Sequence, residues 1–267
     1  MMKKEDILKL AENGDHIPGV YNYCDRWCER CPFTARCLNF KMSEEKFGDP
    51  ETRDINSSAY WEEFGETFHE TLELLKEMAE ERGIDLESDS EEGCQGSLGG
   101  DDESDTVVHI LMHMSRSYLS MVDDWFESYS GFEDTEDEPE TDSGAVSSLH
   151  FSEEDTAVFK DSVEVVRWYQ YQIHVKLRRA LCSAEDEKSM ALDDCPRDSD
   201  GSAKVALIGI DRCIGAWGKI LKMFPAQKEK TLAMISLLKR LCIFVEKEFP
   251  KARTFVRPGF DEVSRDG

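Results

Sequence analysis

Four cysteines within fourteen residues are the strongest chemical feature of this 267-residue sequence. They are Cys24, Cys28, Cys31 and Cys37, with the spacing C-x3-C-x2-C-x5-C. Thiolates bind soft or borderline metals, and four of them complete a tetrahedral zinc site or hold one iron–sulfur cluster. The segment is short enough for all four sulfurs to converge on one centre. We therefore expect residues 1–50 to form a cysteine-rich metal-binding module.

The spacing of the cysteines bears on which metal they hold. Structural zinc sites usually combine two C-x2-C pairs across a longer spacer, and this segment has one such pair, Cys28 and Cys31. Short, unequal spacers are typical of cluster proteins. Cys31-Pro32 is similar to the Cys-Pro of the bacterial ferredoxin run, although there the proline follows the fourth cysteine. The expected cofactor is a [4Fe–4S] cluster, and zinc is the alternative.

Three of the cysteines also carry a resemblance to a known family. Cys24-x3-Cys28-x2-Cys31 resembles the motif of radical S-adenosylmethionine enzymes. The resemblance covers eight residues and implies a βα-barrel with one iron left open for chemistry. This sequence shows no alternation of strand and helix patterns, and Cys37 supplies a fourth thiol. Both observations argue against that chemistry.

Composition narrows the partners and the compartment. The formal net charge is −25, and residues 84–105 and 131–150 carry sixteen Asp and Glu and no Lys or Arg, which leaves −9 for the rest. An acidic surface repels nucleic acid and anionic membranes, so neither is an expected partner. No apolar stretch reaches the length of a signal peptide or a membrane span. We expect a cytoplasmic protein, where thiols stay reduced and clustered cysteines indicate metal rather than disulfides.

The rest of the chain has the pattern of an all-α protein. Apolar residues recur at helical spacing in five long segments, and no alternating strand pattern stands out. These segments are 57–82, 104–129, 152–184, 202–224 and 227–249. They predict a bundle of about five long helices over residues 56–250, followed by a tail at 251–267. Acidic segments at 84–105, 131–150 and 185–201 are expected to be mobile linkers.

Two of these helices are expected in the middle of the bundle. Segment 152–184 carries a main apolar stripe and a second one, Trp168, Tyr171 and Val175, on roughly the opposite side. Segment 202–224 begins with an apolar run and contains Gly209, Gly215 and Gly218, which would let a neighbouring helix approach closely. Helices that are apolar on two sides are buried.

Charged residues on these two helices form a second candidate site, a polar pocket of Glu164, Arg178, Lys204 and Asp211. Charges on buried helices must be paired or functional. In one interpretation they form a structural ion-pair network. In the other, Lys204 or Arg178 binds an anion and Glu164 or Asp211 moves protons.

Two histidine patterns are expected to face solvent. Glu66-x-x-His69 resembles one half of a ferritin-like di-iron site, but the sequence contains no second Glu-x-x-His. His109 and His113 have a spacing that metal-binding histidines can share, but they lie opposite the apolar stripe of their helix.

Three functional hypotheses follow. The first is a cytoplasmic [4Fe–4S] protein that works in electron transfer or redox sensing. The second is a non-enzymatic interaction module held by a structural zinc site with four cysteine ligands. The third is an enzyme that uses the polar pocket. The sequence does not name a substrate or a protein or redox partner, and whether the chain is an enzyme stays open.

Overall fold

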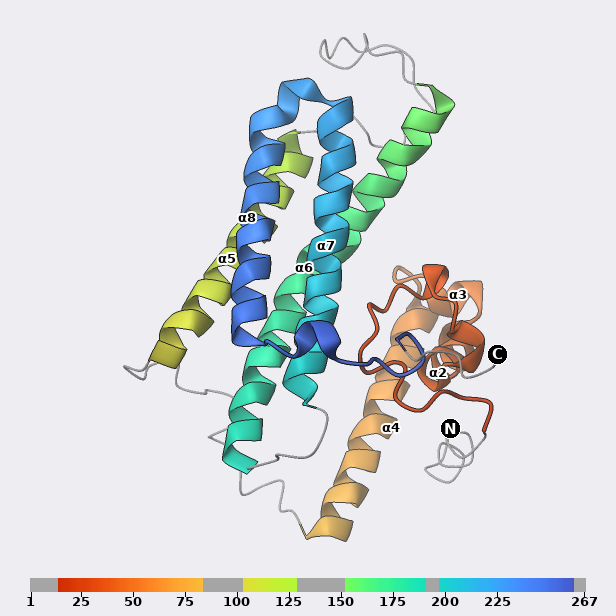
Figure 1. Cartoon of the computed structure of the whole chain (residues 1–267). Coiled ribbons are helices and arrows are strands. Elements are labelled where there is room, and N and C mark those ends of the chain that lie inside the picture. Colours follow the sequence, from red (N-terminus) through yellow and green to blue (C-terminus); the bar gives the residue numbers. More distant parts are fainter. Residues whose placement is uncertain (1–13, 84–102, 129–151, 191–196, 262–267) are drawn as a thin grey trace, which may run out of the picture. The chain divides into compact units, whose positions relative to one another are not determined.

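The computed structural model describes residues 14–83, 103–128, 152–190 and 197–261, and every regular element in these ranges is helical (Figure 1). The expected all-α class is therefore confirmed for the described part of the chain. The acidic segments 84–102 and 129–151 lie outside the described residues. The chain forms two compact units, residues 1–101 with 257–267, and residues 102–256.

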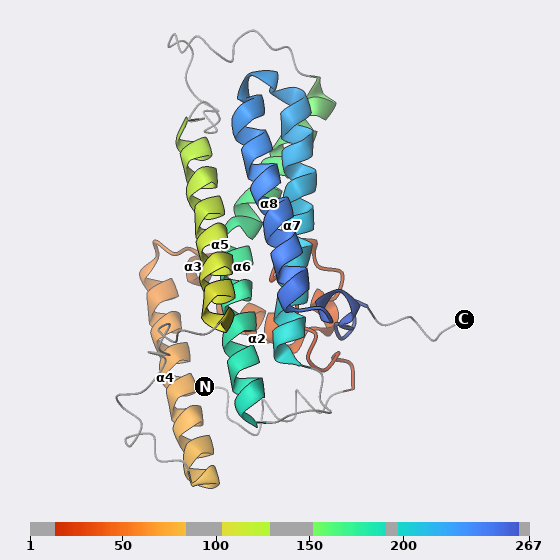
Figure 2. The ribbon, with the colours of Figure 1, turned by 60° about the vertical axis from the view of Figure 1, so that its left-hand side comes forward.

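The second unit is a bundle of four helices. They are α5 (Glu103–Ser128), α6 (Glu153–Met190), α7 (Asp198–Met223) and α8 (Lys228–Glu248). In Figures 1 and 2 they run alongside one another; α6 packs on α7, α7 on α8, and α5 on both α6 and α8. A short 3-10 helix, η4 (Pro225–Gln227), joins α7 to α8, and another, η5 (Ala252–Thr254), follows α8 and packs on α7.

Large apolar side chains fill the centre of this bundle. Each helix contributes fully buried residues at the spacing of one helical face, as the sequence pattern predicts. The largest are Leu111, Tyr118, Trp125, Tyr169, Ile173, Leu177, Leu207, Ile210, Trp217, Ile220, Met234 and Leu238. Among the described residues, no helix combines the length and the apolar character needed to cross a membrane.

Local signals place most helix ends where the sequence predicts them. Ser152 caps α6, because its hydroxyl accepts from the Asp155 amide at 3.1 Å and donates to the Asp155 carboxylate at 2.7 Å. The segment between α6 and α7 is shorter than the linker expected at 185–201, since α6 continues to Met190. Side-chain contacts between the facing ends explain this, because Glu187 of α6 accepts from the amide of Ser199, in the first turn of α7, at 3.0 Å.

Helix α7 is buried as expected, but α6 is not buried on its second side. Fourteen of the 26 residues of α7 are buried, and residues 199–203 are buried without interruption. On α6, Tyr171 and Val175 are 55% and 59% exposed. The prediction from two apolar stripes is therefore wrong for α6. Tyr171 keeps its hydroxyl hydrogen-bonded at the surface by donating to the Asp123 carboxylate at 3.3 Å.

The first unit holds the cysteine segment and three helices: α2 (Leu38–Phe47), α3 (Pro50–Arg53) and α4 (Ser58–Arg82). Helix α4 is well delimited. The Ser57 hydroxyl accepts from the Ala59 amide at 3.2 Å, and Gly83 ends the helix with φ 67°. Helix α4 belongs to this unit and packs on α2 and α3. Together with the four helices of the second unit it makes five long helices in the described part of the chain, which agrees roughly with the expected number.

The apolar stripe of α4 is exposed. Its large members are between 39% and 59% exposed, and Ala79 is the buried residue of this helix. They are Trp61, Phe64, Phe68, Leu72 and Leu75. Helical spacing showed that these residues share a face, but it did not show what covers that face. Glu66, His69, His109 and His113 are all exposed, as expected.

Candidate metal centre

Two single helical turns shape the cysteine segment. Cys28 opens the first, η1 (Cys28–Arg30), and Cys37 follows the second, η2 (Thr34–Arg36), as the residue before α2. Arg26 has φ 58°, and it is the one non-glycine residue with positive φ in the described ranges. Such a conformation is uncommon for an arginine and turns the chain sharply between Cys24 and Cys28.

Contacts with the residues before it anchor this segment. The Ile17 amide donates to the Arg36 carbonyl at 3.0 Å, and the Arg36 Nε donates to the Asp15 carbonyl at 3.2 Å. Trp27 is 8% exposed, and the guanidinium of Arg30 lies 4.0 Å from the centre of its ring. These hydrogen bonds join the residues before the cysteine segment to Arg36 near its end, and Cys24, Cys28 and Cys31 lie between the bonded residues.

All four predicted cysteines line one hollow of about 20 Å³. Aromatic side chains form much of its remaining wall: Tyr21, Trp27, Phe33, Phe40 and Phe260. The first four of these lie within or next to the cysteine segment. Phe260 lies more than two hundred residues further along the chain, in the segment predicted to be a tail. The sequence carries no signal that would pair it with the cysteines.

The thiols of this hollow influence one another electrostatically. Burial, and next the neighbouring thiols of Cys24 and Cys37, raise the pKa of Cys28 from 9.0 to about 11. Burial also raises the pKa of Cys31, while the Phe33 amide, which donates to the Cys31 sulfur at 3.4 Å, lowers it. Without a cation these two groups therefore favour the neutral thiol form. A bound metal would reverse this preference, because its charge stabilises thiolates.

The sulfurs are not arranged as metal ligands. In the described ranges no three His, Cys, Asp or Glu side chains lie in an arrangement that could hold a metal ion. Cys24 illustrates the reason, since its thiol donates to the Tyr21 carbonyl at 3.4 Å, a bond that only the protonated form makes. The structure thus brings the four cysteines to one hollow but does not show the metal module that their spacing predicts.

Three arginines lie in the cysteine segment. Arg26 lines the hollow, whereas Arg30 stacks on Trp27 and Arg36 bonds to the backbone of Asp15. Besides burial, the neighbouring Cys24, Cys37, Glu29 and Cys31 raise the pKa of Cys28. A bound metal ion would add positive charge to the hollow and so favour the thiolate form.

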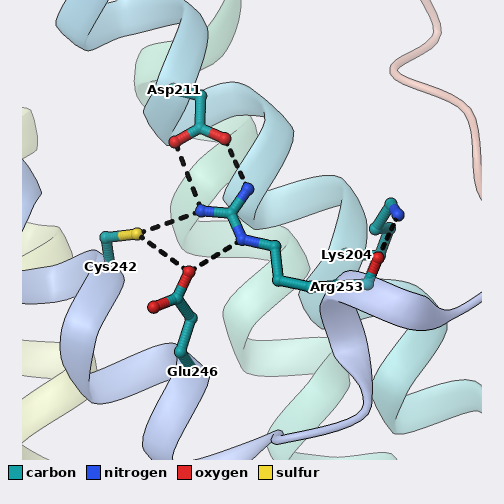
Figure 3. Close-up of polar contacts among 5 residues, drawn as sticks. All are labelled: Lys204, Asp211, Cys242, Glu246 and Arg253. Carbon is teal, nitrogen blue, oxygen red and sulfur yellow. Dashed lines mark hydrogen bonds and ion pairs between the residues drawn. The ribbon is translucent and has the colours of Figure 1, made fainter.

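The second candidate site, the polar pocket, is centred on a residue that sequence reasoning missed. Arg253 of η5 pairs with Asp211 of α7 at 2.5 Å and with Glu246 of α8 at 2.8 Å (Figure 3). It also donates to the Cys242 sulfur at 3.2 Å, and its carbonyl accepts from the Lys204 ammonium at 2.6 Å. Arg253 lies in the segment predicted to be a tail, and a single charged residue there did not indicate a functional or structural role.

This cluster has the geometry of a structural ion-pair network. The side chains of Arg253, Asp211 and Glu246 are between 40% and 50% exposed, so Asp211 is less buried than expected. Burial raises the pKa of Cys242, so its thiol is not an activated nucleophile. Lys204 and Asp211 of the predicted pocket are thus both bonded to Arg253.

The other two pocket residues, Glu164 and Arg178, lie on α6. Arg178 stands near His174, where burial and the charges of Arg116 and Arg178 lower the pKa of the imidazole. His174 Nδ1 lies 2.9 Å from the Ser115 hydroxyl of α5, which links the two helices. That Glu164 and Arg178 share a pocket with Lys204 and Asp211 stays a prediction.

Comparisons with known protein families, with curated proteins and with solved structures find no match to this chain. Any functional assignment therefore rests on the chemistry of its own residues.

Proposed function

We propose that this protein binds a metal centre through Cys24, Cys28, Cys31 and Cys37, and that the centre is a [4Fe–4S] cluster serving electron transfer or redox sensing in the cytoplasm. The observation that carries the proposal is that four thiols from one fourteen-residue segment line one hollow. Cysteine is the usual ligand of such clusters, and it supplies all four ligands of a [4Fe–4S] centre.

The surroundings of the thiols support a metal rather than four free cysteines. A wall of aromatic rings limits solvent access, which tunes the potential of a cluster. The Phe33 amide already donates to the Cys31 sulfur, and hydrogen bonds of this kind to cluster sulfurs also tune the potential. To bind a metal as a thiolate, Cys24 would give up its hydrogen bond to the Tyr21 carbonyl.

A structural zinc ion is the second candidate, because four cysteine thiolates also complete a tetrahedral zinc site, and Cys28 and Cys31 have the C-x2-C spacing of such sites. In this alternative the zinc would stabilise the fold of residues 14–47, and the protein would act as an interaction module.

Metal analysis of protein purified without oxygen tests the proposal and separates the two candidates. A brown protein that contains iron and acid-labile sulfide, and whose visible absorption bleaches on reduction, supports the cluster. A colourless protein that contains one zinc per chain supports the alternative. Protein that contains neither metal, even after reconstitution with iron and sulfide or with zinc, would contradict a metal-binding function.

A further inference from the structure

Five residues near the C-terminus, Arg257 to Asp261, pack on the cysteine segment. The Phe260 ring lines the hollow, and its centre lies 4.9 Å from the centre of the Phe33 ring, edge to face. Gly259 has φ 77°, and a Cβ at this position would lie 3.1 Å from Ile17 and 3.3 Å from Val20. The backbone is therefore pressed directly against the base of the cysteine loop, at a position that suits glycine.

An internal ion pair holds Phe260 in place. Arg257 donates to the Asp261 carboxylate through both Nε and Nη2, at 2.9 Å and 3.0 Å. The same carboxylate accepts from the Arg257 backbone amide at 3.1 Å. The two side chains are 15% and 26% exposed, and the guanidinium lies 4.7 Å from the centre of the Phe260 ring. The Phe260 ring thus contacts both Phe33 and the guanidinium of a bidentate, mostly covered ion pair.

We propose that Phe260 is the lid of the four-cysteine hollow and that the Arg257–Asp261 pair is the latch that keeps the lid closed. The role as a lid over bound metal rests on the proposed function, whereas the covering of the thiols does not. A phenyl ring offers no metal ligand, so its function here is to limit access. The lid slows the approach of chelators, oxidants and alkylating reagents to the sulfurs, and it does not determine how much metal the site holds.

The first test uses metal-free, reduced, full-length protein and the rate at which N-ethylmaleimide alkylates Cys24, Cys28, Cys31 and Cys37, followed by mass spectrometry. Phe260→Ala should raise this rate roughly tenfold, because it removes an aromatic pair and a cation–π contact. Asp261→Asn, which keeps the ring and weakens the latch, should raise it by a smaller factor. The exposed thiol of Cys182 serves as the internal reference and should react equally in all variants.

Phe64→Ala is the matched control, since Phe64 lies in the same unit, is 46% exposed and does not line the hollow. It should leave the alkylation rate at the parent value. A change of less than about twofold for both Phe260→Ala and Asp261→Asn would overturn the lid, because local opening would then not depend on these residues.

The second test uses metal-loaded protein and the rate of transfer of its metal to a chelator. Phe260→Ala should bind as much metal per chain as the parent and release it faster, by roughly the same factor as in the alkylation test. If Phe260→Ala binds no metal although the parent does, the ring is needed to form the site and the lid proposal is wrong. If the parent itself binds no metal, the proposed function fails, while the alkylation test still decides whether Phe260 covers the thiols.

Discussion

Helices α6 and α7 approach closely at Gly209, and substituting this glycine gives a sharp test of the bundle. A Cβ at position 209 would lie 2.9 Å from Tyr169 Cδ1 and 3.1 Å from Ile173 Cγ1. These two side chains are 0% and 1% exposed, and the Tyr169 hydroxyl is also bonded by Arg212. Neither can move away without disturbing the core, so Gly209→Ala overpacks the interface.

The expected magnitude follows from two opposing effects. Replacing a helical glycine by alanine gains about 1 kcal/mol of helix propensity. Overpacking a well-filled core costs about 1–3 kcal/mol. Gly209→Ala should therefore lower the free energy of unfolding by about 1 kcal/mol.

Gly215 supplies the matched control on the same helix. It is exposed and has no heavy atom within 4 Å of an added Cβ, so Gly215→Ala should stabilise the protein by up to about 1 kcal/mol. The expectation from the sequence that Gly215 lies against a neighbouring helix is therefore wrong, and Gly209 occupies that place. Urea unfolding followed by circular dichroism should separate the two variants by about 2 kcal/mol without a change in slope. The reasoning is refuted if Gly209→Ala is as stable as Gly215→Ala.

Three further predictions concern polar contacts of the bundle. Arg253→Met should lower the free energy of unfolding by about 1 kcal/mol or less, because the side chains of Arg253 and Asp211 are 40% and 50% exposed. A decrease several times larger, measured by urea unfolding, would contradict the interpretation as an exposed ion-pair network. Tyr118→Phe should lower the free energy of unfolding by about 1–3 kcal/mol, because the buried Trp217 Nε1 loses the hydroxyl to which it donates at 3.0 Å. An unchanged free energy of unfolding would contradict this hydrogen bond. Burial and two nearby arginines lower the pKa of His174 below its ordinary value of 6.5. The unfolded chain therefore binds this proton more readily than the folded one, and the free energy of unfolding should decrease as the pH falls below 6.5. His174→Gln should reduce this loss, and parallel pH–stability curves for parent and variant would count against the prediction.

The helices could be predicted from the sequence because their signals are local. Apolar spacing, the Ser152 cap and the Gly83 stop each act within a few residues. Both ends of α4, α5 and α8 and the start of α6 lie within one residue of the predicted ends, whereas α6 continues six residues beyond its predicted end. The start of α7 differs because tertiary contacts fix it. Asp198 accepts from Arg179 at 2.6 Å and from Ser183 at 2.7 Å, both on α6, so the helix begins before the apolar run.

The placement of apolar faces and of the two candidate sites could be predicted less well. The stripe of α4 shows which residues share a face but not which element covers it. The cysteine spacing predicts that four thiols meet, but the direction of each sulfur depends on single bond rotations and on whether a metal is present. Arg253 and Phe260 could not be placed at all, because each contacts residues far away in the sequence through a short segment without periodicity.

The central claim is that Cys24, Cys28, Cys31 and Cys37 are ligands of one metal centre. The most direct measurement is metal and sulfide per chain in the four single Cys→Ser variants of full-length protein purified without oxygen. Cys182→Ser and Cys242→Ser, whose thiols lie in the helical bundle, serve as controls. We predict a sharp loss of metal in each of the first four variants and parent content in both controls. Full metal content in all four cysteine-segment variants would contradict the account.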